Sequence, residues 1–130
     1  MRAYLPINHE ELAIFLNSAS KEVESILATT PFYVGDNSEL DEEEIEYLLS
    51  LEAAKESLEL RTTKHAPGIT LAIELEPSQV NQVQEKSVTL NSPIKWEQVQ
   101  CALLLFPDDE EEELVWFATQ EISLTMGEWK

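Results

Sequence analysis

The sequence predicts a single α+β domain over residues 1–130, with a mixed sheet of about five short strands covered by three main helices. Three observations predict this fold. Helical and strand-like hydrophobic patterns alternate along the chain in the order βαβαββαβα. Hydrophobic residues make up 43% of the sequence, close to the usual globular proportion. A chain of 130 residues can also bury a core without disulfide or metal crosslinks.

The N-terminal half contains two well-marked helix starts. After a short strand at Arg2–Ile7, Asn8 and Glu11 have the spacing of a capping box, and apolar residues continue at helical spacing to Ala19. A weaker strand is expected at 25–30, before Pro31. Asp41 then caps a second helix that runs to about Arg61.

The C-terminal half is predicted from alternation and from proline and glycine positions. Apolar and polar residues alternate at 69–76, which predicts a half-buried strand. We expect a loop at 78–86, a strand at 87–90, a short helix from Ser92-Pro93 to Val99, a central apolar strand at 101–106, and a last helix from Asp108 to about Met126.

The charge of the chain is strongly negative, with 26 acidic against 8 basic residues and a formal net charge of −18. The basic residues are scattered, so binding to nucleic acid is not expected. The unbroken acidic run 108–113 is interpreted as a solvated helix start, where carboxylates favour exposed N–H groups. The alternative is loose attraction of a hard cation such as calcium or magnesium.

Cysteine content and hydropathy predict a cytoplasmic protein. Cys101 is the single cysteine, no signal-peptide pattern begins the chain, and the longest apolar run is 101–106. Membrane insertion is therefore not expected. Glycine occurs only at 35, 68 and 127, which excludes glycine-rich phosphate loops. Two histidines and one cysteine do not suggest a transition-metal site, and no cofactor is predicted.

The predicted last helix carries an acid on its apolar side. Projected at about 100° per residue, Glu121 falls beside Phe117 and Ala118. One interpretation is structural: Glu121 pairs with a base such as Arg2, or caps backbone groups. The other makes it a general acid or base in a pocket that includes Arg2 and Tyr4.

Two further surfaces are candidates for an interface. On the predicted last helix, Trp116 and Gln120 lie one turn apart on the exposed side, and an exposed tryptophan often marks a contact surface. The second helix has two apolar stripes. One stripe suits the sheet, whereas the other requires a further helix, such as the first, or another protein chain. The candidate contact residues on this second stripe are Tyr47, Leu51 and Leu58.

Two terminal motifs carry a family resemblance. They are Met1-Arg2-Ala3-Tyr4-Leu5-Pro6 and Leu114-Val115-Trp116-Phe117-Ala118-Thr119-Gln120-Glu121. In the middle helix, Glu46-Tyr47 and Ala53-Ala54 with Ser57-Leu58 also match. In these residues the chain resembles a small family of uncharacterised actinobacterial proteins, which usually have tyrosine where Phe117 stands. The resemblance implies a shared fold and a bacterial cytoplasmic setting. Because that family has no established activity, it transfers no catalytic residues.

Three functional hypotheses follow. The leading one is a non-enzymatic protein–protein interaction or regulatory domain, which uses the second helix or the Trp116 and Gln120 side to bind itself or a partner. The second is a small-ligand-binding protein or enzyme with a pocket that contains Glu121. The third is an acidic domain that imitates nucleic acid toward a basic protein.

Overall fold

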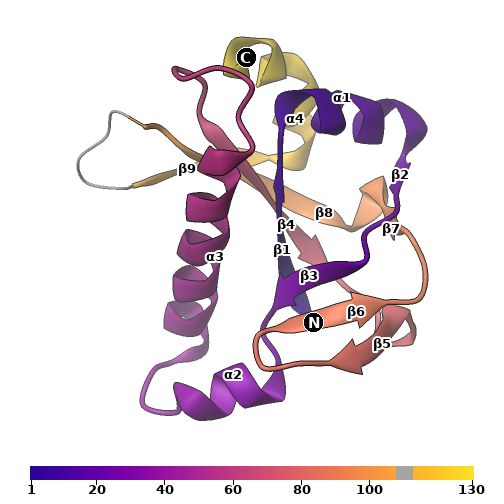
Figure 1. The fold of residues 1–130 in the computed structure, drawn as a ribbon, viewed down its shortest axis with the longest axis vertical. Coiled ribbons are helices and arrows are strands. Elements are labelled where there is room, and N and C mark those ends of the chain that lie inside the picture. The colour runs from indigo at the N-terminus through magenta and orange to yellow at the C-terminus, as the bar shows by residue number, and fades with distance from the viewer. Residues whose placement is uncertain (108–112) are drawn as a thin grey trace.

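The computed structural model describes residues 1–107 and 113–130 and has an α+β fold. A seven-stranded sheet in these residues has the order β5-β6-β3-β1-β4-β8-β9, with four α-helices packed around it (Figure 1). The elements in chain order are β1 (Arg2–Ile7), α1 (His9–Ser18), β2 (Ser20–Lys21), β3 (Ser25–Ala28), α2 (Pro31–Asp36), α3 (Glu42–Glu59), β4 (Gly68–Glu74), the 3₁₀ helix η1 (Pro77–Gln79), β5 (Val80–Val83), β6 (Ser87–Leu90), β7 (Ile94–Lys95), η2 (Trp96–Gln98), β8 (Val99–Leu105), β9 (Leu114–Ala118), α4 (Thr119–Thr125) and η3 (Met126–Trp129).

The prediction of a mixed sheet is wrong. Every neighbouring pair in the seven-stranded sheet is antiparallel, and β2 and β7 form a separate antiparallel pair. Interleaved helices suggested parallel crossovers between neighbouring strands, but α1 joins β1 to β3, which pair antiparallel. The strands before and after α3, β3 and β4, run in the same direction but are separated by β1, which is antiparallel to both. The strand count is also higher than the expected five, because β5 and β9 extend the two ends of the sheet.

Local capping explains why the first two predicted helices are correct. The Asn8 side chain accepts a hydrogen bond from the Glu11 backbone N–H at 2.8 Å, and Glu11 accepts in return from the Asn8 N–H. Asp41 accepts from the Glu44 N–H at 2.8 Å at the start of α3. Each cap satisfies a donor that the first helical turn leaves unpaired.

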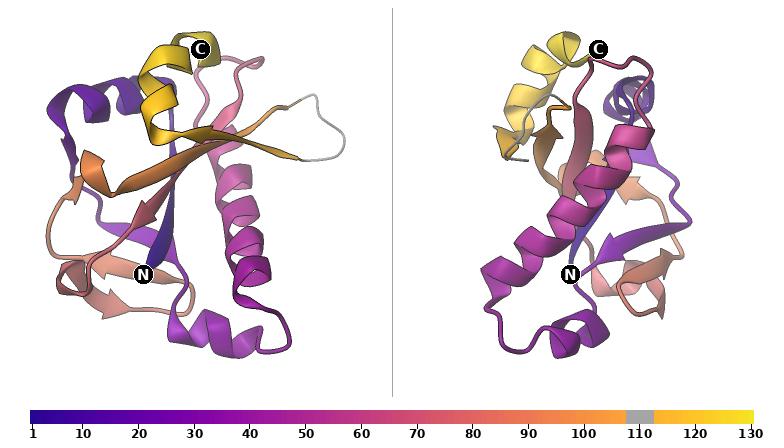
Figure 2. Two further views of the ribbon diagram at one scale, coloured as in Figure 1. Left: turned by 180° about the vertical axis from the view of Figure 1, so that it is seen from behind. Right: turned by 60° about the vertical axis from the view of Figure 1, so that its left-hand side comes forward.

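The larger core lies on the face of the sheet that α1 and the C-terminal helices cover. Ala3, Leu5 and Ile7 of β1 point into it and pack with Leu12 and Phe15 of α1. The α1 and C-terminal segments lie together at one end of the molecule (Figure 2), where the His9 ring nitrogen Nε2 is 2.8 Å from the Met126 carbonyl oxygen. Two aromatic contacts complete this core, with ring centroids 5.1 Å apart for Phe15 and Trp96 and 5.0 Å apart for Phe117 and Trp129.

The opposite face of the sheet is covered by α3. Tyr4 and Ala72 from neighbouring strands pack there with Leu49 and Ala53 of α3. Because successive residues of a strand point to opposite faces, Tyr4 lies on this side while Ala3 and Leu5 lie on the other. The first helix is therefore not the partner of the second stripe of α3, since the sheet separates the two helices.

Three other predicted elements differ in the structure. The expected loop 78–86 contains η1 and β5, and the expected helix 92–99 is replaced by β7 and η2. Ile94 is fully buried in β7 opposite Lys21, so its burial in the strand pair outweighs the helix-start signal of Ser92-Pro93. At 31–36 the structure adds α2, in which Thr30 caps the helix and Pro31 begins it.

The predicted helix from 108 to 126 is wrong over residues 114–118 and correct over residues 119–125. Residues 114–118 form β9, and only Thr119–Thr125 are α-helical. The run Leu-Val-Trp-Phe-Ala combines β-branched and aromatic side chains, which fit a strand paired with β8. The acidic run 108–113 lies outside the described residues except for Glu113, which is exposed.

Candidate functional site

Arg2 and Tyr4 occupy alternate positions of β1 on the face covered by α3. The Tyr4 side chain is 5% exposed and belongs to the smaller core. Arg2 pairs in register with Glu74 of β4, and its Nε lies 3.9 Å from Glu74 Oε2. Arg2 therefore pairs with Glu74 rather than with the predicted partner Glu121.

Trp116 lies on the same face of the sheet as Tyr4. It is opposite Leu103 in the β8–β9 pairing, and directly opposed side chains project on one side. Leu103 and Cys101 both pack against the smaller core under α3. Trp116 is 59% exposed, and its side chain hydrogen-bonds to the thiol of Cys101.

Arg2, Tyr4 and Trp116 are brought together around Cys101. Burial raises the pKa of the Cys101 thiol, while the Trp116 hydrogen bond and the charge of Arg2 oppose this shift. Burial also raises the pKa of Tyr4, and the negative charge of Glu46 adds to it. Three predicted binding residues thus converge, joined by Cys101 and Glu46, neither of which was a predicted site residue.

Glu46 and Glu74 make this polar cluster acidic. Burial raises the pKa of the Glu46 carboxyl, Arg2 lowers it, and the neighbouring acids Glu42 and Glu74 raise it further. The single guanidinium of Arg2 thus faces two carboxylates. No signal in the sequence pairs Glu46 with Arg2, because the two residues are far apart in the chain and only the packing of α3 on β1 joins them.

Gln120 and Glu121 lie elsewhere. Both are exposed on α4, a helix whose buried residue Ile122 belongs to the core on the other face of the sheet. The Glu121 carboxylate accepts a hydrogen bond from the Ala118 N–H at 2.9 Å and so caps the start of α4. The prediction that Glu121 sits on an apolar helix face is wrong, because the continuous helix on which it was projected does not exist.

Tyr47, Leu51 and Leu58 share one flank of α3. The opposite flank is identified by Glu52, which forms an ion pair with Lys86 beside β6. Tyr47 is 52% exposed, whereas Leu51 and Leu58 are half-buried. Helix α3 contacts β8, the neighbour of β9 in the sheet (Figures 1 and 2). We call Tyr47, Leu51, Leu58, Leu103 and Trp116 the α3–β9 surface.

A hollow of about 490 Å³ adjoins this surface at the start of α3. Its apolar lining comes from Leu40, Tyr47 and Leu48, and its acidic lining from Asp41, Glu43 and Glu44. Asp41 is the helix cap and its carboxylate is engaged by the Glu44 N–H. The hollow combines an aromatic ring with exposed carboxylates, which suits the alkyl stem and charged end of a lysine or arginine side chain.

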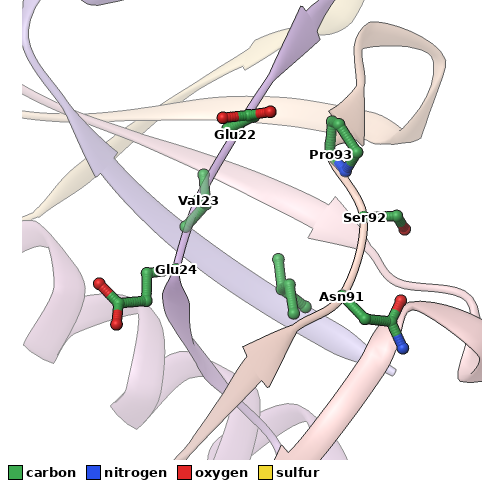
Figure 3. A pocket seen from close by; sticks show the side chains of 7 residues that line it. Glu22, Val23, Glu24, Asn91, Ser92 and Pro93 are labelled. Carbon is green, nitrogen blue, oxygen red and sulfur yellow. The ribbon is translucent and has the colours of Figure 1, made fainter.

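A second hollow, of about 340 Å³, lies between the segments that precede β3 and follow β6 (Figure 3). Glu22, Val23 and Glu24 line one wall, and Asn91, Ser92 and Pro93 line the other. In Figure 3 the Glu24 carboxylate and the side chains of Asn91 and Ser92 point away from the gap. Its polar groups do not converge, so this hollow lacks the arrangement of a ligand-binding site.

No group of three or more His, Cys, Asp or Glu side chains in the described part of the chain is arranged to hold a metal ion. No helix within residues 1–107 and 113–130 has the length and apolar character needed to span a bilayer.

Comparison with known proteins identifies a family. The model of a family of unknown function, DUF6912, matches residues 1–105. The match covers most of the chain, so the chain belongs to this family. It includes the N-terminal motif with Arg2 and Tyr4 and all of α3, whereas β9 and α4 lie beyond it. Comparison with curated proteins gives no match, and neither does comparison with solved structures.

Proposed function

We propose that this member of the DUF6912 family is a non-enzymatic protein-binding domain, and that the α3–β9 surface is its contact site. The proposal is carried by one observation: Trp116 is 59% exposed and Tyr47 is 52% exposed beside half-buried leucines. Aromatic side chains supply large contact areas and dominate the energetics of many interfaces. Their exposure next to apolar residues is typical of a surface that a partner covers.

The charge of the chain supports a basic partner. Acidic residues lie close in sequence to the contact residues: Glu43 and Glu46 precede Tyr47 on α3, and Glu113 precedes β9. At a net charge of −18 the chain repels other copies of itself at low ionic strength and attracts cationic proteins. A basic protein is also the partner of the acidic-mimic hypothesis, so charge alone does not separate these two hypotheses.

The ligand-binding alternative has lost its main support. That alternative placed Glu121 in a pocket with Arg2 and Tyr4, where a buried carboxyl acts on a substrate. Glu121 is exposed and caps α4, while Tyr4 lies on the face of the sheet opposite the one that α4 covers. These positions favour a binding surface over a catalytic pocket that contains Glu121.

The experiment is affinity capture from the native host with matched variants of the full chain. The test variant is the double substitution Tyr47→Ala and Trp116→Ala. The control is the double substitution Ile14→Ala and Leu124→Ala, which removes apolar side chains that are 61% and 83% exposed on α1 and α4. Thermal unfolding of each variant is measured first, because all four side chains are exposed and their loss is expected to leave the fold intact.

The expected result is a captured protein whose yield falls by at least about ten-fold with the test variant and not with the control. Equal recovery with both variants would contradict the α3–β9 surface as the contact site. If no captured protein requires Tyr47 and Trp116, the proposed function itself is contradicted.

A further inference from the structure

The two outer strands of the sheet are built differently. At one end, β5 has the polar residues Asn81 and Gln82, and its register with β6 shifts between Val80 and Val83. Irregular pairing and polar side chains are common ways to prevent a sheet edge from accepting another strand. At the other end, β9 pairs with β8 in continuous register over all of its five residues.

Strand β9 lacks the usual protection of a sheet edge. Its sequence, Leu-Val-Trp-Phe-Ala, contains no charge, proline or glycine. Val115 is 40% exposed on one face of the strand, and Trp116 is 59% exposed on the other. The outer edge of a strand carries backbone N–H and C=O groups, so an added strand gains main-chain hydrogen bonds as well as apolar contacts on both faces.

The charges around β9 select the occupant. Glu113 stands immediately before the strand, and the Glu121 carboxylate is held beside its end by the Ala118 N–H. No lysine or arginine occurs between Lys95 and Lys130 in the sequence. A second copy of the chain pairing antiparallel through β9 would bring Glu113 of one copy toward Glu121 of the other, which like-charge repulsion disfavours. A strand with lysine or arginine side chains instead meets carboxylates at both ends.

We propose that β9 accepts an extended, lysine- or arginine-rich segment of another protein as an additional antiparallel or parallel strand. This inference rests on the proposed function and specifies its binding mode. Alternate aliphatic side chains of the segment pack on Trp116 or Val115, and its cationic side chains lie near Glu113 and Glu121. Main-chain hydrogen bonds to β9 hold the segment, and charge selects it.

The test uses the full chain labelled with ¹⁵N and a synthetic probe peptide in which lysine and valine alternate. A peptide of equal length with glutamate in place of lysine is the control probe. Amide hydrogen exchange of residues 114–118 is followed with and without each peptide, because an added strand protects the outward-facing N–H groups alone. The lysine peptide is expected to slow exchange at alternate residues of β9 by at least about ten-fold, and the glutamate peptide is not.

Two substitutions provide a matched pair in the protein. Val115→Lys places a cation on the edge strand, whereas Leu124→Lys makes the same change of charge at an exposed site on α4. Affinity for the lysine peptide is expected to fall by about ten-fold or more in Val115→Lys and to stay within about two-fold in Leu124→Lys. Equal effects of the two substitutions would show that the change in net charge alone explains the loss of peptide affinity, and this would overturn the proposal.

Other outcomes also overturn the inference. Peptide binding without protection of β9 amides rules out strand addition, and so does the absence of any protection at millimolar peptide. A dimer of the wild-type chain that Val115→Lys dissociates would make a second copy the occupant.

Native-host capture separates the two proposals. If Val115→Lys retains the captured protein while Tyr47→Ala with Trp116→Ala loses it, strand addition fails and the proposed function stands.

Discussion

Gly68 of β4 lies directly against Ser57 of α3. A Cβ atom at Gly68 would lie 2.3 Å from Ser57 Oγ and 3.1 Å from the Leu58 backbone nitrogen. The Ser57 hydroxyl is itself fixed, because it donates a hydrogen bond to the Ala54 carbonyl at 2.5 Å. Glycine at this position lets the last turn of α3 lie almost on the backbone of β4, and this contact holds α3 over Tyr4 and the polar cluster.

The first prediction concerns that contact. Gly68→Ala is expected to lower the free energy of unfolding by about 1–3 kcal/mol, since the added methyl group displaces Ser57 and the helix backbone. Chemical denaturation measures the change. Gly35→Ala is the control, because nothing lies within 4 Å of a Cβ there and alanine favours its helix. Stability of Gly68→Ala equal to that of the wild type would contradict the close approach.

The second prediction uses two buried threonines. Among the described residues, the Thr70 hydroxyl is buried without a hydrogen-bond partner, whereas the Thr30 hydroxyl donates to the Glu85 carbonyl and accepts from the Tyr33 N–H. Thr70→Val is expected to stabilise the fold by about 1 kcal/mol, because it removes an unpaired polar group without changing the side-chain shape. Thr30→Val is expected to destabilise it by a similar or larger amount. Thermal unfolding of both variants measures these changes in stability. Destabilisation by Thr70→Val would show that the Thr70 hydroxyl has a hydrogen-bond partner.

The third prediction separates a capping role of Glu121 from a catalytic one. Glutamine can also accept the hydrogen bond from the Ala118 N–H, so Glu121→Gln is expected to change stability by less than about 0.5 kcal/mol. Glu121→Ala removes the acceptor and is expected to cost about 0.5–1 kcal/mol. The exposed Glu128 provides the control Glu128→Ala. Unfolding in denaturant measures all three, and a larger loss in Glu121→Gln than in Glu121→Ala would exclude the cap.

The fourth prediction concerns pH. Burial raises the pKa of Glu46 in the folded chain, so the folded state keeps this proton at pH values where the unfolded state releases it. The stabilisation from protonated Glu46 is complete below the unfolded pKa of about 4.3. It is lost as the pH rises through the higher folded pKa, which leaves ionised Glu46 destabilising at neutral pH.

Glu46→Gln is therefore expected to be more stable than the wild type at neutral pH, with the difference shrinking as the pH falls toward about 4. The measurement is the free energy of unfolding of both proteins across this pH range. Glu59→Gln changes an exposed glutamate on the same helix and controls for the loss of one negative charge. A stability difference that grows toward acidic pH would have the wrong sign for a raised pKa.

The helix starts could be predicted because caps are local. Asn8 with Glu11 and Asp41 with Glu44 need only the chain between them, and both caps form as expected. The strands at 25–28 and 87–90 were likewise indicated by short-range patterns. The run Leu114–Ala118 was not, because a continuous apolar segment fits a helical projection and a strand equally well. Its pairing with β8 decides between them.

The sequence by itself determined the α+β class, the helices that begin at Asn8 and Asp41, and the net charge of −18. Only the tertiary structure decided that β9 is the last strand of the sheet, that Trp116 stands on this strand beside Cys101, and that Glu121 is a cap instead of a buried acid. Periodicity tells which side of an element is apolar, but the neighbour that covers that side comes from distant parts of the chain. For Trp116, the described part of the chain leaves more than half of the residue's surface exposed.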